Sequence, residues 1–530
     1  MPGQVLRKPD ARPIWTRLSV QQWMVVCFVM GLIWRMFRWL VNGPLWGDEA
    51  FIAVNFLTHD FSGMLDPLDH SQVVPLGYLW VQFVLSKAFG TSEIALRLTA
   101  VLSGLGVLIL MWRWLPRVLN KYHALAVFAI FSGSYYPVRH AAEVKPYGSD
   151  LFVSLLLLIA GWAVWSKPKH RGRWAILCLG LPLAVWFSYP SVFVGVSILL
   201  MLLWRTLRDR ELRKCATPWI GGFATAAFFV ISGFLMWQIF ARNQAAGNVS
   251  LATSDHWKGA IPPGFTEGGV RGVFSWLLAF VRWGVEVHTG NMLAYPAGGK
   301  NFGSTGTFLL LIVGIATLWR RRRALLGFLI MLAGLCLIAA IARLYPYGGS
   351  ARTSLFLAPT ICILAGVGVV TLLSCVGRLS LRWLRESRLG LMCGWQRGPR
   401  SVISNLCLFA LAMVLLTVAG TAREFLKPYK TIEDIRCRQT VLDLSNQVVS
   451  GDRWIFVGDI HDVVSGDDEQ AHAPILRVPN IARWGGDAAR ARFYLILASQ
   501  RKSVPLDFGP DPVNAIKGAG RTWVFHFETG

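Results

Sequence analysis

The sequence predicts an all-α polytopic membrane protein that ends in a small α/β domain on the outer side of the membrane. Of the 530 residues, 54% are hydrophobic, the mean hydropathy is +0.47, and basic residues recur in short loops between apolar segments. A spanning helix needs about 20 predominantly apolar residues, and we expect about 11 to 12 such helices. The candidate segments lie near 19–41, 95–113, 123–138, 146–166, 174–189, 190–206, 218–240, 305–320, 324–343, 354–376 and 402–420.

The net charge of +24 indicates membrane topology. Arg and Lys occupy short loops at regular intervals, which is typical of cytoplasmic loops, so we exclude nucleic acid as a partner and expect membrane lipids. The first apolar segment is long and lacks a small-residue cleavage site, which favours a retained span with a cytoplasmic N-terminus. The outward segments are then 42–94, about 139–145, Ser188–Pro190, 242–304, 343–353 and everything after 421.

Residues 75–89 (PLGYLWVQFVLSKAF) are apolar but short for a span. A full crossing here would move the basic loop 113–121 to the outer side, against the positive-inside rule. We therefore expect an interfacial or half-buried helix. The alternative is a full crossing, which raises the count of spans to twelve.

Asp48 and Glu49 sit side by side where the chain leaves the first apolar segment. Paired carboxylates at a membrane surface are costly to desolvate, so this placement predicts a functional site. The competing interpretation is that the pair begins the next short helix, since acidic residues favour helix N-termini.

The outer loop 42–94 is acidic, with Lys87 as its one base. Such a loop can position a general base, bind a divalent cation through oxygen ligands, or remain solvated. A divalent metal is thus a candidate cofactor, and no other is implied. The nine cysteines contain no CxxC pair and predict no disulfide framework or structural zinc site. The six acids of the loop are Asp48, Glu49, Asp60, Asp66, Asp69 and Glu93.

Cations also gather on the outward segments. Arg35 and Arg38 share a face near the outer end of the first helix, and Arg343 and Arg352 bracket the Gly-rich turn LYPYGGSAR. The stretch RHAAEVKPYGSD adds further charges at 139–150. Arg and Lys are the residues that bind phosphate oxygens, so these positions indicate an anionic substrate. The alternative for each one is snorkelling or a structural ion pair.

Residues 242–304 form a connection too long to be passive. WKGAIPPGFTEGG is rich in Gly and Pro, and VFSWLLAFVRWGVEVHTG has helical apolar spacing with Arg282, Glu286 and His288 on its polar side. We expect an interfacial helix and a mobile flap over the site. A purely structural amphipathic helix is the alternative.

The chain changes character after about residue 425. DRWIFVGDI, ARFYLILAS and RTWVFHFET are predicted to be strands, and IEDIRCRQTVLDLSNQVV a helix. We expect a transmembrane domain over 1–424 and a small extracytoplasmic α/β domain over 425–530, to which we assign no catalysis.

Three stretches together resemble the membrane glycosyltransferases of the GT-C class. They are WGDEAFIAVNFLTHDFSGMLDPLDHSQVVPLGYLW, GTSEIALRLTAVLSG and YYPVRHAAEVKPYGSDLF. The most similar group is the bacterial branch related to protein O-mannosyltransferases and lipopolysaccharide sugar transferases. The resemblance covers about residues 20–165, with a weaker match at SARTSLFLAPTICILAGVGV.

The resemblance implies a GT-C fold in a bacterial inner membrane and an inverting transfer of a sugar from a polyprenyl-phosphate donor on the outer face. The acceptor is a lipid, a glycan or a protein. Asp48 matches the catalytic acidic position, where a carboxylate is the general base, and Glu49 matches its supporting neighbour. Lys145 and Asp150 match polar positions of a KxYxxD segment, and Arg352 matches an Arg expected near the donor phosphate.

Other residues complete the expected site. Relatives often have His-Pro-Pro or Lys-Pro-Pro before the interfacial helix, whereas this chain has HSQVVP, which makes His70 and Gln72 both candidate acceptor contacts. Arg139 and Arg35 join Lys145 and Arg352 as donor-phosphate candidates. Tyr147, Asp150 and His288 are further substrate-binding candidates.

Two other functions compete with transfer. A transporter or flippase of lipid-linked glycans is also polytopic, but such proteins usually show two related halves, which this sequence lacks. A glycopolymer ligase or polymerase would use an undecaprenyl-diphosphate donor and Arg-rich outer loops without the acidic pair. The chain also has no GxxxxGK[ST] loop, in agreement with a donor that needs no nucleotide.

Overall fold

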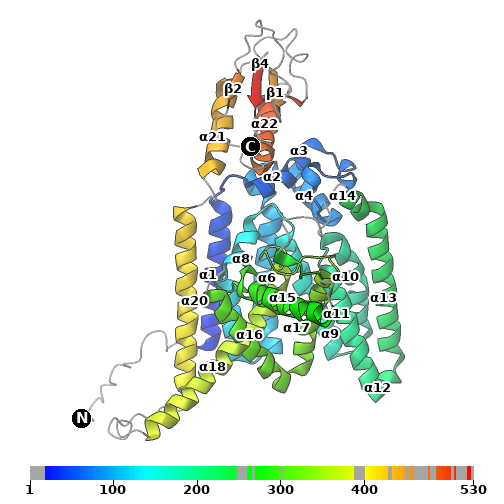
Figure 1. Ribbon diagram of the computed structural model, residues 1–530, viewed down its shortest axis with the longest axis vertical. Helices are drawn as coiled ribbons and strands as arrows, with labels where there is room; N and C mark the ends of the chain where they lie inside the picture. Colours follow the sequence, from blue (N-terminus) through cyan, green and yellow to red (C-terminus); the bar gives the residue numbers. More distant parts are fainter. Residues whose placement is uncertain are drawn as a thin grey trace, which may run out of the picture.

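A computed structural model describes most of the chain. The described residues are 18–246, 259–264, 269–299, 302–386, 400–427, 432–447, 453–457, 475–477, 485–502, 506–508 and 522–526. The structure is a bundle of long helices, with a group of short helices and a small sheet at one end (Figure 1).

Within the described residues, nine helices are long and apolar enough to cross a membrane. The segment 355–375, made of the turn Leu355–Leu357 and the first part of α18, is the most enclosed of them, with 89% of its apolar window buried. The nine are α1 (Val20–Leu40), α6 (Leu98–Val118), α9 (Tyr147–Ser166), α11 (Ser191–Arg208), α13 (Ala216–Met236), α16 (Phe302–Arg321), α17 (Arg323–Ile341), α18 (Ala358–Glu386) and α20 (Arg400–Leu426).

Two further predicted segments form helices that are shorter than a full span. They are α7 (Lys121–Ser132) and α10 (Arg171–Phe187), of 12 and 17 residues. Asn120 caps α7 through its side chain, and every residue of α7 from 123 to 132 is buried against its neighbours. Each of the eleven predicted segments therefore coincides with a helix, while the number that cross the membrane stays a prediction.

The short helices at one end of the bundle include α4 (Leu76–Phe89), which begins after Pro75. Its 14 residues span about 21 Å, less than a hydrocarbon core, and it is outside the nine candidate spans found in the described chain. We call this end, opposite α12 (Arg210–Arg213), the α2 end of the bundle (Figure 1). The other short helices are α2 (Gly47–Ala53), α3 (Asn55–Thr58), α5 (Glu93–Leu96), α8 (Tyr135–Arg139) and α14 (Arg242–Ala246).

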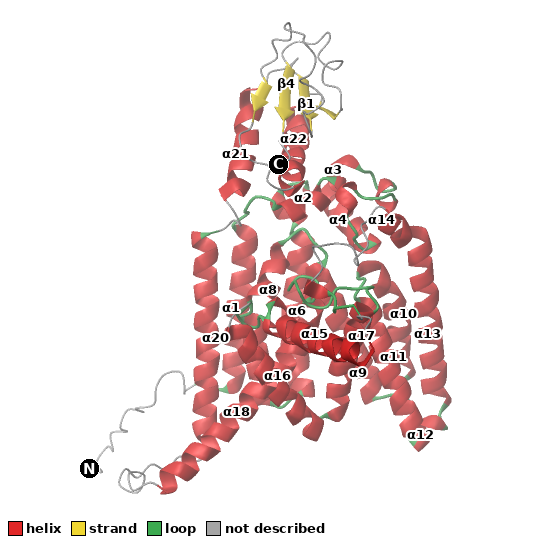
Figure 2. Cartoon of the chain, viewed as in Figure 1, coloured by secondary structure: helices red, strands yellow, loops and turns green. Residues whose placement is uncertain are grey.

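The predicted helix of the 242–304 connection is α15 (Gly269–Thr289). It runs across the long helices rather than along them (Figure 2). The expected mobile flap falls partly on residues 247–258 and 265–268, which lie outside the described residues. Short 3-10 turns occur at Gly63–Leu65, Asp69–Ser71, His140–Ala142, Asn291–Leu293 and Leu355–Leu357, and a π segment at Trp237–Ala241.

The C-terminal region contains α21 (Ile432–Gln447), α22 (Gly485–Lys502) and a parallel sheet in the order β2-β4-β1-β3. The strands are β1 (Arg453–Val457), β2 (Ile475–Arg477), β3 (Leu506–Phe508) and β4 (Thr522–His526), with Ile455 opposite Val524 and Trp454 opposite Leu506. The helix predicted over 432–449 is confirmed by α21, and the strands predicted over 452–460 and 521–529 are confirmed by β1 and β4.

The prediction of a strand at ARFYLILAS is wrong, because these residues belong to α22. This helix packs against α2, α3 and α21, and Ala491, Phe493, Tyr494 and Leu495 are all buried. A helix enclosed on several sides has the same continuous apolar run as a buried strand, so the pattern could not separate the two.

Candidate active site

Asp48 lies in the first turn of α2, with 9% of its surface exposed. Its carboxylate forms an ion pair with the guanidinium of Arg352. The two residues are 304 positions apart, and the sequence predicted both as site residues. The structure therefore brings the candidate base and one candidate phosphate ligand into direct contact.

The loop between α17 and α18 positions Arg352. Gly348 and Gly349 have φ of +71° and +66°, a left-handed conformation that favours glycine. A Cβ on Gly349 would lie 2.7 Å from the Cβ of Ala260, so the loop also passes very close to the connection before α15. The backbone amide of Tyr347 donates to the carbonyl of Ala260 at 2.9 Å, which holds the two segments together.

Lys145 approaches the same place from the segment before α9. It is buried, its Nζ donates to Oε1 of Gln72 at 2.8 Å, and it lies within electrostatic range of Asp48 and Arg352. Burial lowers the pKa of Lys145 to about 8, although the negative charge of Asp48 opposes that shift. Tyr147 lies in the same electrostatic environment. We call Asp48, Arg352, Lys145, Gln72 and Tyr147 the Asp48 cluster.

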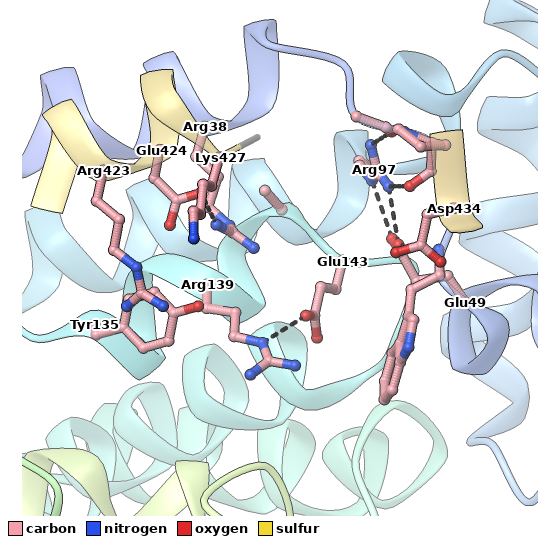
Figure 3. Close-up of a pocket in the computed structure, with 14 residues that line it drawn as sticks. Arg38, Glu49, Arg97, Tyr135, Arg139, Glu143, Arg423, Glu424, Lys427 and Asp434 are labelled. Carbon is pink, nitrogen blue, oxygen red and sulfur yellow. Dashed lines mark hydrogen bonds and ion pairs between the residues drawn. The ribbon is translucent and has the colours of Figure 1, made fainter. Parts of the chain in front are cut away.

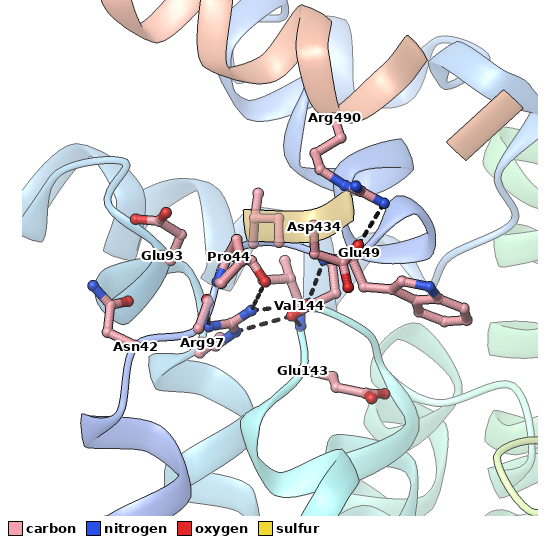
Figure 4. Close-up of polar contacts among 12 residues, drawn as sticks. Asn42, Pro44, Glu49, Glu93, Arg97, Glu143, Val144, Asp434 and Arg490 are labelled. Carbon is pink, nitrogen blue, oxygen red and sulfur yellow. Dashed lines mark hydrogen bonds and ion pairs between the residues drawn. The ribbon is translucent and has the colours of Figure 1, made fainter. Parts of the chain in front are cut away.

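Glu49 has different surroundings from its neighbour. Its carboxylate accepts two hydrogen bonds from Arg97, at 3.0 Å from Nε and 2.8 Å from Nη2. It also accepts from the backbone amides of Trp46 at 3.0 Å and Val144 at 2.9 Å. Figures 3 and 4 both show this buried pair. Glu49 thus ties α2 to the start of α6 and to the segment that carries Lys145.

Arg97 was not among the predicted site residues. It also donates to the backbone carbonyl of Pro44 at 3.2 Å, so it fixes the chain just before α2. The signal was present, because Arg97 ends the GxxExxxR pattern of GTSEIALR. Its partner, 48 positions away, could not be deduced from the spacing.

Arg139 and Arg35 do not join the Asp48 cluster. Arg139 donates from Nε to Glu143 at 2.9 Å and faces a pocket of about 390 Å³ beside Glu49 (Figure 3). Arg35 is buried inside the bundle, where it donates to the carbonyl of Gly31 at 2.9 Å and lies 5.4 Å from the ring of Phe131.

Gln72, which accepts from Lys145, also contacts His70. The side-chain amide of Gln72 donates to the carbonyl of His70 at 3.0 Å, and the imidazole lies 5.0 Å from the ring of Phe51. Partial burial, and then the positive charge of Arg492, lower the pKa of His70. Its neighbour Asp69 pairs with Arg492 of α22 at 2.9 Å.

Asp150 and His288 make no polar contact with Asp48 in the part of the chain that the structure describes. Asp150 is buried in the first turn of α9 and is in electrostatic range of Tyr78, Tyr147 and Tyr189. His288 of α15 lies 3.1 Å from the hydroxyl of Tyr347, within the loop that carries Arg352.

The described part of the chain holds no group of three or more His, Cys, Asp or Glu arranged to bind a metal ion. The DPLD stretch contains two acids that could have been metal ligands. Asp66 is exposed, and Asp69 is paired with Arg492.

Comparison with protein families gives one match. Residues 73–237 match the family described as dolichyl-phosphate-mannose-protein mannosyltransferase. No curated protein matches the chain in sequence.

Solved structures give a match over most of the chain. ArnT from Cupriavidus metallidurans bound to undecaprenyl phosphate is 15% identical, with a TM-score of 0.50 over 92% of this chain and 90% of ArnT. Apo ArnT is 16% identical, with a TM-score of 0.48 over 92% and 85%. The oligosaccharyltransferase AglB from Archaeoglobus fulgidus, in complex with an inhibitory peptide and a dolichol-phosphate, is 11% identical, with a TM-score of 0.47 over 84% and 63%.

Lys145 and Tyr147 of the Asp48 cluster lie inside residues 73–237, whereas Asp48, Gln72 and Arg352 lie outside them. The chain is thus similar over residues 73–237 to the dolichyl-phosphate-mannose-protein mannosyltransferase family, and as a whole it has the fold of the GT-C glycosyltransferase ArnT.

Proposed function

We propose that this chain transfers a sugar from a polyprenyl-phosphate donor to an acceptor hydroxyl by a single inverting displacement. The observation that carries the proposal is the pairing of Asp48 with Arg352 beside the desolvated Lys145. A carboxylate suits proton removal from the acceptor, and the two cations suit a phosphate leaving group.

The ion pair accounts for how the site stays stable without substrate. Arg352 neutralises the buried carboxylate of Asp48, which would otherwise be costly to desolvate. A donor phosphate competes for the guanidinium of Arg352. Once Arg352 turns to the phosphate, Asp48 loses a neutralising partner and becomes a stronger base.

In the reaction, Asp48 takes the proton of the acceptor hydroxyl as its oxygen bonds to the anomeric carbon. The bond between that carbon and the phosphate oxygen breaks, and its electron pair leaves on the phosphate. Arg352 and Lys145 stabilise the charge that grows there, the preorganised electrostatic contribution that is usually the largest in catalysis. Glu49, held by Arg97, fixes the geometry of α2.

The donor class is supported by two similarities. The matching family is described by a dolichyl-phosphate-mannose activity, and the ArnT structure with the same fold binds undecaprenyl phosphate. These lipid phosphates are those of the matching family and of ArnT. A polyprenyl-phosphate sugar is the donor that we propose for this chain by analogy.

The proposed location is the outer face of a bacterial inner membrane. The α2 end of the bundle carries the Asp48 cluster, whereas Arg210, Arg213 and Lys214 lie at the opposite end (Figure 1). The excess of basic loops on that opposite side supports a cytoplasmic assignment for it, which leaves the site outside.

The test uses purified protein in proteoliposomes with radiolabelled polyprenyl-phosphate mannose, glucose and arabinose in turn. We expect donor consumption with one of them, and a loss of about 100- to 10,000-fold in Asp48→Asn. Asp60→Asn is the matched control, because Asp60 is exposed and, among the described residues, bonds only within its own turn. Wild-type rates in Asp48→Asn would contradict the assigned base. Net movement of intact donor across the membrane would favour the transporter.

A further inference from the structure

The pocket beside Glu49 is separate from the Asp48 cluster. It has a volume of about 390 Å³, in the range of small-molecule sites, and lies between the α2 ends of α1 and α20, α8, and α21 (Figure 3). Its lining is mostly charged. The residues are Arg38, Gly43, Pro44, Trp46, Glu49, Arg97, Tyr135, Arg139, Ala142, Glu143, Arg423, Glu424, Lys427 and Asp434.

Each of the four lining acids already has a basic partner. Glu49 pairs with Arg97 at 2.8 Å and Glu143 with Arg139 at 2.9 Å. The other two pairs are Glu424 with Arg38, and Asp434 with Arg490 at 2.6 Å. Three of the five lining bases are therefore neutralised by lining acids. The fourth lining acid, Asp434, is neutralised by Arg490 of α22.

Two lining cations remain, Arg423 and Lys427. In the part of the chain that the structure describes, neither has a carboxylate partner. Arg423 lies in the last turn of α20 and Lys427 directly follows the helix, with its backbone amide donating to the carbonyl of Arg423 at 2.8 Å. The two cations therefore lie one turn apart and repel each other. Arg423 lies 5.5 Å from the ring of Tyr135, which directs its guanidinium along the pocket wall. An anion bound here would relieve the repulsion.

Exposed apolar side chains adjoin these cations at the ends of α20 and α1. Phe425 is 72% exposed and Leu426 is 75% exposed, between Arg423 and Lys427 in the sequence, and Leu40 at the end of α1 is 59% exposed. Both α1 and α20 are candidate spans. A ligand held here would meet two cations and an apolar helix surface together, which is the chemistry of an anionic lipid.

We propose that this pocket binds the phosphate-bearing headgroup of an anionic lipid, at a site distinct from the donor site at Asp48. Arg423 and Lys427 contact the phosphate, and the acyl chains lie along α1 and α20. Trp46 and Glu49 line this pocket, and Asp48 lies between them in the sequence. The bound headgroup is therefore adjacent to the segment that carries the proposed base.

Binding alone tests the site, so the test does not depend on transfer. The full chain is placed in phosphatidylcholine nanodiscs and titrated with fluorescent short-chain phosphatidic acid, and separately with undecaprenyl phosphate. The variants are R423Q/K427Q, the charge-retaining R423K/K427R, and R213Q/K214Q. The last removes one exposed Arg and one exposed Lys at the opposite end of the bundle.

We expect R423Q/K427Q to weaken phosphatidic acid binding about 10- to 100-fold, as for lost hydrogen bonds to a charged group. R423K/K427R and R213Q/K214Q should bind as the wild type does, and R423Q/K427Q should keep its affinity for undecaprenyl phosphate. An equal loss in R213Q/K214Q, or no loss in R423Q/K427Q, would overturn the site. A parallel loss of undecaprenyl phosphate would make the pocket part of the donor site, and full competition by millimolar inorganic phosphate would overturn the lipid assignment.

Discussion

Asp48 and Arg352 form an ion pair across 304 residues of sequence, between the first turn of α2 and the loop before α18. The buried Lys145 lies within electrostatic range of both residues. In the proposed reaction, this arrangement offers one carboxylate to the acceptor and two cations to the phosphate.

Glu49→Gln should destabilise the protein by about 3 kcal/mol or more, because it leaves Arg97 as a buried charge without its partner. The free energy of unfolding is measured in detergent from thermal or denaturant unfolding curves. Glu286→Gln is the control, since the Arg282–Glu286 pair is 83% and 63% exposed and should change stability by less than about 1 kcal/mol. Equal effects in the two variants would show that Glu49 is not a structural anchor.

Affinity for undecaprenyl phosphate should fall as the pH rises through about 8. Lys145 has its pKa lowered to about 8 by burial, so its ammonium is charged below that pH and neutral above it. Titration between pH 7.5 and 9.5 checks this, a range in which a phosphate monoester with a second pKa of about 6 stays fully ionised. Lys145→Arg should flatten the dependence because Arg remains charged. A dependence that persists in Lys145→Arg would assign the titration to another group.

Tyr494→Phe should cost about 1–3 kcal/mol of stability by leaving buried partners unsatisfied. The hydroxyl accepts from the amide of Leu45 at 2.9 Å and donates to Glu93 at 3.0 Å, so α22 is joined directly to the chain before α2. Limited proteolysis together with thermal unfolding measures the effect. Tyr122→Phe should change little, because its hydroxyl makes no hydrogen bond within the described residues. An unchanged Tyr494→Phe variant would mean that α22 does not support the site.

Gly349→Ala should weaken carrier binding, because it strains the loop that carries Arg352. The residue has φ of +66°, and the added Cβ would lie 2.7 Å from that of Ala260. Gly334→Ala in α17 is the control, since its Cβ would meet nothing within 4 Å. We expect a drop in undecaprenyl phosphate affinity only for Gly349→Ala. Wild-type binding by that variant would show that the loop tolerates the change and that its tight geometry does not position Arg352.

The spans were predictable because hydropathy over about 20 residues is a strong signal for a helix in a membrane. The acidic pair and Lys145 could be singled out as candidates because their charges are unusual so close to apolar segments, and their role in a site stays a prediction. The hydrogen-bonding partners of these residues could not be identified from the sequence, because they lie far away along the chain. Glu49 contacts Arg97 and Val144, which are 48 and 95 residues from it. Nor could spacing distinguish Arg35, which is enclosed in the bundle, from Arg38, which faces the pocket.

The α22 error has a different cause. ARFYLILAS is apolar at most positions, and a buried helix and a buried strand share that composition. Tertiary packing favours the helix, because α22 packs against both α2 and α21. Arg490 pairs with Asp434, and Tyr494 donates to Glu93. No local sequence pattern shows these contacts.

The most direct test of the central claim separates binding from chemistry at the ion pair. The affinity for undecaprenyl phosphate is measured in wild type, Asp48→Asn and Arg352→Gln. If Arg352 binds the phosphate and Asp48 only competes for it, Asp48→Asn should bind the carrier as tightly as wild type or more tightly. Arg352→Gln should bind about 10- to 100-fold more weakly. If Asp48→Asn loses carrier binding as Arg352→Gln does, Asp48 is a structural partner of Arg352 and the assignment of a general base is wrong.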